Sequence, residues 1–180
     1  EENDVFMDQQ TAQLIPDRTP TVQDKTMISL FSKERVMELI RYFILFDENV
    51  KKICRYQQYF AIKEVMKTIS QNDEKGNRHS GLIWHTQGSG KSLTMVMLAK
   101  YILMELSDCN PRVVIVTDRK ELDKQITETF SHTRLNPARA TSGRHLVNLV
   151  NSSKADVITS IINKFNTVER LETKNFSRDI

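Results

Sequence analysis

The stretch from Gly81 to Ser92 constrains the fold of this chain more than any other part of the sequence. It runs without a gap from an apolar segment, through a loop that holds Gly88 and Gly90, into a helix-forming segment. The end of the loop reads Gly-x-Gly-Lys-Ser, the core of the phosphate-loop pattern G-x-x-x-x-G-K-[ST]. His85 stands at the first position of this pattern, where glycine is usual. The order of strand, glycine loop and helix predicts a nucleotide-binding site.

Each part of this loop has a chemical reason. Small residues let successive backbone N–H groups converge on a phosphate chain, and the following helix directs the positive end of its dipole to the same place. Lys91 is expected to reach the β- and γ-phosphates, and the Ser92 hydroxyl to ligate Mg²⁺. An ordinary glycine turn before a buried helix is the simpler alternative, but the strand before and the helix after favour nucleotide binding. The predicted nucleotide contacts are Gln87, Gly88, Ser89, Gly90, Lys91 and Ser92, with Lys91 and Ser92 as candidate catalytic residues and Ser92 as the metal ligand.

The composition limits the classes of protein to consider. The chain has 180 residues, 39% of them hydrophobic, which is enough for one sizeable core. Its net charge is only +3, from 26 basic and 23 acidic residues, so an anionic partner must be bound by a local patch. Cys54 and Cys109 are isolated, which fits a reducing compartment and argues against a zinc site. No apolar run approaches the ~20 residues of a membrane span, and the polar start is no signal sequence, so a cytoplasmic protein is expected.

Hydrophobic periodicity separates the start of the chain from the rest. Residues 1–30 are polar, carry two prolines and lack a sustained period, so they are expected to form an extended arm or linker. Apolar residues at helical spacing then predict a helix from Ser32 to a turn at residues 47–49, and a second helix over residues 62–69. Both helices are expected to pack on the sheet that follows.

The remainder of the chain alternates between strands and helices. This alternation implies an α/β fold, with a parallel sheet and helices on both of its faces. Besides the strand that leads into the phosphate loop, strands are predicted over residues 112–117 and 156–159, and helices over residues 93–106, 122–130 and 146–150.

Several stretches resemble the ATP-driven motor of superfamily-2 helicases, and within that superfamily the motor (R) subunit of type I restriction endonucleases. The segment from His85 to Ser92 selects this subfamily, because most helicases carry a small residue where His85 stands. The resemblance implies a P-loop NTPase fold of the RecA-like type, ATP and Mg²⁺ as cofactors, and double-stranded DNA as a partner. It runs from about residue 30 to about residue 165, and its other stretches are residues 43–46, 54–62, 116–125 and 157–165.

The resemblance also implies how the adenine base is read. In such motors a glutamine before the phosphate strand reads the adenine edge, and Arg55-x-x-Gln58 looks like that motif. A side-chain amide suits this role because it donates and accepts a hydrogen bond at once. Taken alone, the sequence favours Gln58 as an exposed helix residue, and for Arg55 the neighbouring Gln57 offers a competing register. Arg55 and Gln58 are the predicted base contacts.

Two loops after predicted strands are expected, by the same resemblance, to lie along the DNA backbone. Hydroxyl, guanidinium and ammonium groups suit phosphate oxygens, and they position DNA without reading its sequence. Charged residues at strand ends are often simply solvated, which is the alternative. The predicted contacts are Thr117, Arg119 and Lys120 after one strand, and Thr159, Ser160 and Lys164 after the next.

The chain departs from this family in one respect. Such a motor needs an acidic box, normally Asp-Glu on a later strand, and no Asp-Glu pair follows Ser92. Residues 31–180 are therefore expected to be the N-terminal part of a first motor domain, truncated before the acidic box, and residues 1–30 a linker from an upstream nuclease domain.

The resemblance implies a parent protein that is an ATP-dependent type I site-specific deoxyribonuclease. It would translocate DNA, cleave it, and work with methyltransferase and specificity subunits, while the present chain alone is expected to be inactive. One alternative is another superfamily-2 DNA translocase with a different partner set. The other is a nucleotide-binding interaction module that never turns over.

Overall fold

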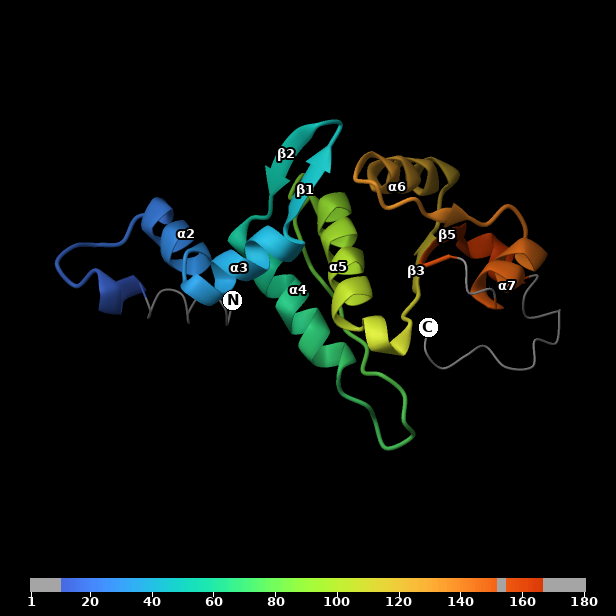
Figure 1. Cartoon of the computed structure of the whole chain (residues 1–180), viewed down its shortest axis with the longest axis horizontal. Coiled ribbons are helices and arrows are strands. Elements are labelled where there is room, and N and C mark those ends of the chain that lie inside the picture. Colours follow the sequence, from blue (N-terminus) through green and yellow to red (C-terminus); the bar gives the residue numbers. More distant parts are fainter. Residues whose placement is uncertain (1–10, 152–154, 167–180) are drawn as a thin grey trace.

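The computed structural model describes residues 11–151 and 155–166 of the chain. A mainly helical part comes first in the sequence, and a part that contains a parallel sheet comes second (Figure 1). The first part holds α2 (Val22–Leu30), α3 (Lys33–Tyr42), β1 (Ile44–Asp47), β2 (Val50–Ile53), α4 (Tyr56–Ile69) and α5 (Lys91–Glu105). The second part holds β3 (Val113–Thr117), α6 (Lys120–His132), β4 (Ala138–Arg139), α7 (Gly143–Asn151) and β5 (Val157–Ile161), with short 3₁₀ turns at Ser107–Cys109 and Ile162–Lys164.

The sheet is parallel, and its strand order is β3-β5-β4. Val113 of β3 lies opposite Val157 of β5, and Ala138 of β4 lies opposite Ile158 of β5. The β-branched runs that predicted two of these strands therefore form neighbouring strands. The short strand β4 was not predicted, because two residues carry no detectable period. With β5 in the middle, the central strand has a neighbour on both edges.

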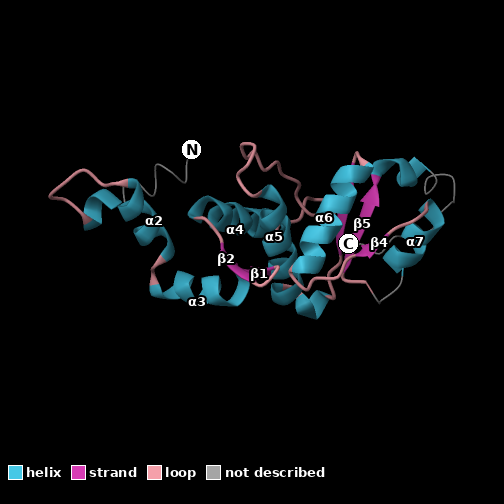
Figure 2. Ribbon diagram, turned by 90° about the horizontal axis from the view of Figure 1, so that it is seen from above, coloured by secondary structure: helices cyan, strands magenta, loops and turns pink. Residues whose placement is uncertain are grey.

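Helices cover both faces of this sheet. Along β5, Val157 belongs to one apolar cluster and Ile158 to another, as expected for side chains that alternate across a strand. The first cluster includes Ile126 and Phe130 of α6, and the second includes Leu146 of α7. Figure 2 shows α6 and α7 on opposite sides of the strands. The predicted α/β fold, with a parallel sheet between helices, is confirmed.

A hairpin replaces the last turn of the first predicted helix. α3 ends at Tyr42, and Ile44–Asp47 forms β1, which pairs antiparallel with β2. Glu48 and Asn49 both have positive φ, 49° and 66°, which is the geometry of a two-residue turn with the twist that a hairpin needs. The turn at residues 47–49 was predicted correctly, but it joins two strands and does not end a helix.

Two further expectations are wrong in these residues. Part of the expected extended arm is helical: α2 begins after Thr21, whose hydroxyl caps the helix while the Asp24 carboxylate accepts from the Thr21 N–H at 2.8 Å. The strand expected before the phosphate loop is not paired, and Leu82 and Trp84 are each 85% exposed. A strand forms only beside another strand, and no described strand lies next to this segment.

None of the described helices combines the length and apolar character that crossing a membrane requires.

Candidate nucleotide-binding site

The phosphate loop ends in a sharp backbone turn at the start of α5. Gly88 has φ 76° and Gly90 has φ 83°, values in the left-handed region that glycine adopts without strain. Gly90 is the N-cap of α5, so the helix begins at Lys91 directly after the loop. The free backbone N–H groups of the first turn and the positive end of the helix dipole therefore face the loop, as anion binding requires.

The Lys91 side chain is folded back over the loop. Its ammonium donates to the carbonyl oxygen of His85 at 2.9 Å and to that of Thr86 at 2.6 Å. Lys91 is otherwise exposed, and no carboxylate among the described residues pairs with it. The two carbonyl oxygens hold the cation at the mouth of the loop, so a phosphate oxygen arriving there meets a positive charge without competing with an ion pair.

The loop also has polar atoms and space that a phosphate could use. The buried hydroxyl of Ser89 has no hydrogen-bond partner among the described residues. At Gly88, an added Cβ would meet nothing within 4 Å, so the backbone there is open on one side. Ser92 lies partly buried in the first turn of α5, next to Lys91. These features fit a phosphate chain held by the loop, with the Ser92 hydroxyl as the group that could ligate Mg²⁺.

Gln58 holds this loop from the side of α4. Its amide oxygen accepts from the backbone N–H of Arg55 at 2.8 Å, the capping arrangement for a glutamine in the first turn of a helix. Its amide nitrogen donates to the Thr94 hydroxyl at 2.9 Å and, over longer distances of 3.3 and 3.4 Å, to the carbonyl oxygens of Gly90 and Ser89. Gln58 is only 6% exposed. It therefore joins the start of α4 to the start of α5.

A small pocket of about 270 Å³ lies beside the loop. It brings together Arg55 and Gln58, which were predicted to read the base, with Trp84 and residues of the phosphate loop. Within this pocket the two neighbouring glutamines differ: Gln57 is exposed, whereas Gln58 is buried and its amide is already hydrogen-bonded. The predicted contact between Gln58 and adenine stays a prediction, and the link between Gln58 and the loop is a role that sequence reasoning missed.

A polar network fixes α4 against its neighbours. Glu38 of α3 accepts hydrogen bonds from Tyr59 and, at 2.9 Å, from Lys63, and Lys63 also donates to the Tyr101 hydroxyl of α5 at 3.0 Å. Burial alone would raise the pKa of Glu38, but the hydrogen bonds from Tyr59 and Lys63 outweigh burial and hold this pKa below its ordinary 4.5. The network therefore stabilises the ionised carboxylate and ties α3, α4 and α5 together.

The residues that were predicted to contact DNA differ in how exposed their side chains are. Arg119 and Lys120 are exposed at the start of α6. Thr117 is only 6% exposed, and its hydroxyl lies 3.4 Å from the carbonyl oxygen of Arg119.

The other three predicted residues do not present free groups at the surface. Thr159 and Ser160 are fully buried in β5, with Thr159 3.1 Å from the Thr127 hydroxyl. The Lys164 ammonium donates to the carbonyl oxygen of Ala140. The central strand is covered on both faces, so the hydroxyls of Thr159 and Ser160 do not reach solvent in this structure, and their contact with the DNA backbone stays a prediction. Arg119 and Lys120 are the predicted contacts whose charged side chains are exposed.

An ion pair between a buried carboxylate of α6 and an exposed arginine of β4 was not foreseen from the sequence. Asp123 is completely buried, and one of its carboxylate oxygens accepts from the Arg139 guanidinium at 2.6 Å. Its other oxygen has no hydrogen-bond partner among the described residues. Because Asp123 lies on α6 and Arg139 on β4, the pair joins the helix to the far edge of the sheet. No periodicity signals such a pair, since its members are 16 residues apart.

Comparison with known proteins assigns most of the chain to a family. The pattern of the SWI2/SNF2 ATPase family matches residues 57–180. The chain is 44% identical over 108 residues to the type I restriction enzyme HindI endonuclease subunit of Haemophilus influenzae, which covers 57% of this chain and 10% of that protein. It is 32% identical over 163 residues to the putative type I restriction enzyme MjaIXP endonuclease subunit of Methanocaldococcus jannaschii, which covers 88% of this chain and 16% of that protein. The chain therefore spans less than a fifth of the length of either relative.

Proposed function

This chain belongs to the SWI2/SNF2 ATPase family, and from that premise we propose that it is the ATP-binding part of the DNA-translocating endonuclease (R) subunit of a type I restriction enzyme. The observation that carries the proposal is the phosphate loop at the start of α5, with Lys91 held at its mouth by two carbonyl oxygens. Relatives named as restriction enzyme endonuclease subunits support the choice among motors of this kind. Residues 31–180 would form the N-terminal part of the first motor domain.

The proposed ligand is ATP with Mg²⁺. The Lys91 ammonium would leave the two loop carbonyls and neutralise the β- and γ-phosphates, while the backbone N–H groups at the start of α5 would bind phosphate oxygens. The Ser92 hydroxyl would ligate Mg²⁺, which when bound neutralises charge on the β- and γ-oxygens. Arg55, Gln57 and Gln58 line the pocket beside the loop, where the adenine base would lie. Gln58 would position the loop in addition to any contact with the base.

Turnover is proposed for the longer protein and not for these residues alone. Hydrolysis in such motors needs an acidic box that orients water around Mg²⁺, and no Asp-Glu pair follows Ser92 in this sequence. The proposed DNA contacts are Arg119 and Lys120, which would bind phosphate oxygens and leave sequence recognition to a specificity subunit. A methyltransferase subunit would complete the assembly, which we place in the cytoplasm together with its DNA.

The test is the variant Lys91→Ala in the full-length protein that contains this chain. Removal of the ammonium is expected to weaken binding of a fluorescent ATP analogue by at least about tenfold and to abolish ATP-dependent restriction. Lys67→Ala is the matched control, because Lys67 is exposed on α4 and its ion pair with Glu64 is exposed as well. Nucleotide affinity and restriction that are equal in both variants would show that the loop does not bind phosphate.

A further inference from the structure

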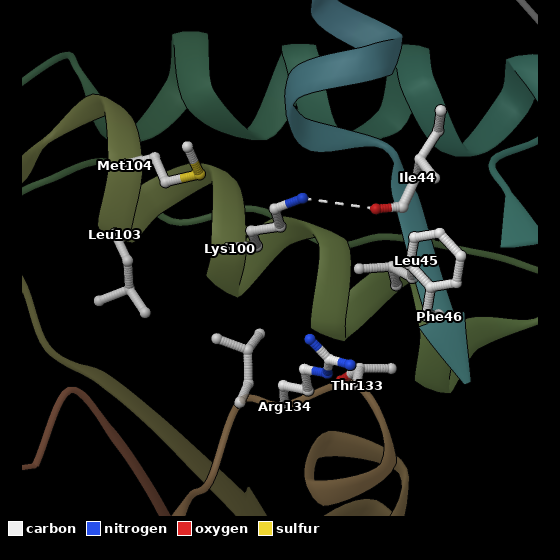
Figure 3. A pocket seen from close by; sticks show the side chains of 9 residues that line it. Ile44, Leu45, Phe46, Lys100, Leu103, Met104, Thr133 and Arg134 are labelled. Carbon is white, nitrogen blue, oxygen red and sulfur yellow. Dashed lines mark hydrogen bonds between the residues drawn. The ribbon is translucent and has the colours of Figure 1, made fainter. Parts of the chain in front are cut away.

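A larger pocket lies away from the phosphate loop. It has a volume of about 580 Å³ and lies between β1, the C-terminal part of α5 and the loop that follows α6 (Figure 3). Pockets of about 300–1,000 Å³ are the usual size of small-molecule sites. Lys100, which lines it, follows Lys91 by nine residues on the same helix, or about 13 Å along the axis. The pocket is therefore separate from the proposed nucleotide site.

The walls of this pocket are mostly apolar. Leu45 and Phe46 contribute from β1, Leu103 and Met104 from α5, and Leu135 from the loop after α6. Phe46 is 53% exposed and Met104 is 39% exposed, so apolar surface remains uncovered at the pocket. An occupant that buries this surface gains free energy in proportion to the apolar area removed from water.

Lys100 places a cation at these apolar walls. Its ammonium makes a long hydrogen bond of 3.4 Å to the carbonyl oxygen of Ile44, which Figure 3 shows as a dashed line. No carboxylate pairs with Lys100 within the residues that the structure describes, and burial lowers the pKa of this amine. Asp47, the acidic residue of β1, is already paired with Lys52. A partly buried ammonium without a counter-ion favours binding of an anion.

Arg134 supplies a second cation from a fixed backbone. Its φ is 65°, and its N–H donates to the Ser131 carbonyl at 3.1 Å, while the Leu135 N–H donates to the Phe130 carbonyl at 3.1 Å. These bonds end α6 and hold the base of the Arg134 side chain in place. Figure 3 shows the guanidinium extending from this loop towards β1. In the described part of the chain it has no ion pair, and its planar fork matches a carboxylate.

We propose that this pocket binds a small carboxylate carried on an apolar body, with Lys100 and Arg134 binding the carboxylate and the walls from β1 and α5 covering the apolar part. Two cations without counter-ions select an anion, and the apolar walls select against a small hydrated one such as inorganic phosphate. The pocket volume of about 580 Å³ is that of a small-molecule site, which favours a free small molecule as the occupant. The inference goes beyond the proposed function and does not depend on it, because no residue of the phosphate loop lines this pocket.

The test compares three probes that share one tail and differ in charge. Calorimetric titration of the full 180-residue chain with octanoate, octanol and octylammonium is expected to show binding in the order octanoate, octanol, octylammonium, with octanoate at least about tenfold tighter than octanol. This comparison needs no variant, so a variant that fails to fold leaves the proposal testable. Lys100→Met keeps an unbranched apolar side chain and removes only the charge, and Arg134→Gln removes the guanidinium.

Each variant is expected to weaken octanoate binding about tenfold and to leave octanol binding unchanged. Lys67→Met, on exposed α4 surface, is the matched control and is expected to bind octanoate as the unmodified chain does. Equal affinities for octanoate and octanol, or octanoate binding that survives both charge-removing variants, would overturn the proposal. Binding of a peptide with an acidic residue among apolar ones, together with no binding of octanoate, would also overturn it, in favour of a protein-docking surface.

Discussion

The amide nitrogen of Gln58 donates to the hydroxyl of Thr94 at 2.9 Å, and this bond joins the first turn of α4 to the first turn of α5. Thr94 also donates to the carbonyl oxygen of Gly90 at 3.2 Å, so the last glycine of the phosphate loop is bonded to both residues. Because Gln58 also caps its own helix through Arg55, the start of α4 and the end of the loop are held as one polar unit. The position of the loop therefore depends on α4.

Replacing Gln58 is expected to lower the stability of the fold even without nucleotide. Gln58→Leu leaves buried polar groups of the loop and of α4 without a partner, which costs about 1–3 kcal/mol in the free energy of unfolding. Gln57→Leu, next to it on the exposed side of α4, is expected to change this free energy by less than about 0.5 kcal/mol. Urea unfolding of both variants measures the difference. Equal losses would mean that the hydrogen bonds of Gln58 contribute no net stability.

Gly90 is expected to tolerate a methyl group less well than Gly76. Both glycines have φ near +80°, so alanine at either position suffers backbone strain of about 1–2 kcal/mol. At Gly76 the added Cβ would meet nothing within 4 Å, whereas at Gly90 it would lie 3.0 Å from the amide nitrogen of Gln58. Gly90→Ala should therefore lower the free energy of unfolding more than Gly76→Ala.

A double mutant separates the steric clash from the strain. In a Gln58→Ala background the close approach is gone, so Gly90→Ala and Gly76→Ala are expected to cost equal amounts. An excess cost at Gly90 that persists in this background would show that Gln58 is not the cause.

Acid is expected to weaken the junction of α3 and α4 through Glu38. The folded-state pKa of this carboxyl lies below its ordinary 4.5, so its ionised form adds stability above that pH and loses it as the pH falls through the folded pKa. The melting-temperature difference between the unmodified chain and Glu38→Gln should be largest near pH 7 and shrink below pH 4.5. Glu64→Gln, which removes an exposed partner of Lys67, is the control. A difference that does not change with pH would exclude the ionised network.

Arg119 and Lys120 are expected to bind duplex DNA through its phosphates in the full-length protein. Arg119→Ala or Lys120→Ala should weaken binding equally for two unrelated duplexes and flatten the slope of log K against log salt by about one unit for each phosphate that is no longer neutralised. Thr159→Val should leave both quantities unchanged, because Thr159 is fully buried. Slopes that stay the same in both charge-removing variants would make these residues ordinary solvated charges, and weaker binding confined to one duplex would indicate that bases are read here.

Local sequence patterns were enough to predict those helices, strands and loops that are determined by their own residues. The runs of β-branched residues became β3 and β5, and the Gly-x-Gly-Lys-Ser segment became a loop with two left-handed glycines before a helix. The helices predicted over residues 62–69, 93–106, 122–130 and 146–150 are present with bounds that differ by a few residues, apart from α4, which begins earlier at Tyr56. In these segments hydrophobic period, capping and turn residues all agree.

The expectations that failed depended on distant neighbours. The apolar segment before the phosphate loop reads as a strand, but a strand needs a partner, and none of the described strands supplies one. The hydroxyls of Thr159 and Ser160 were expected to be accessible at the end of a strand. However, β5 occupies the middle of the sheet and is covered on both faces. Ile44 continues the apolar stripe of α3 in the sequence, which predicted a longer helix. Instead, Ile44 begins β1, because the turn at Glu48 and Asn49 lets this strand pair with β2.

The exposed segment before the phosphate loop gives this protein an intrinsic optical reporter. Trp84 is the single tryptophan of the sequence, so all tryptophan emission of the chain arises from that position. Its side chain is 85% exposed, and it lines the small pocket beside the loop together with Gln58 and Ser89. A shift of the emission towards shorter wavelength would therefore report that this one position has become covered, whether by a base in the pocket or by a neighbouring strand. No added label is needed to follow the approach to the phosphate loop.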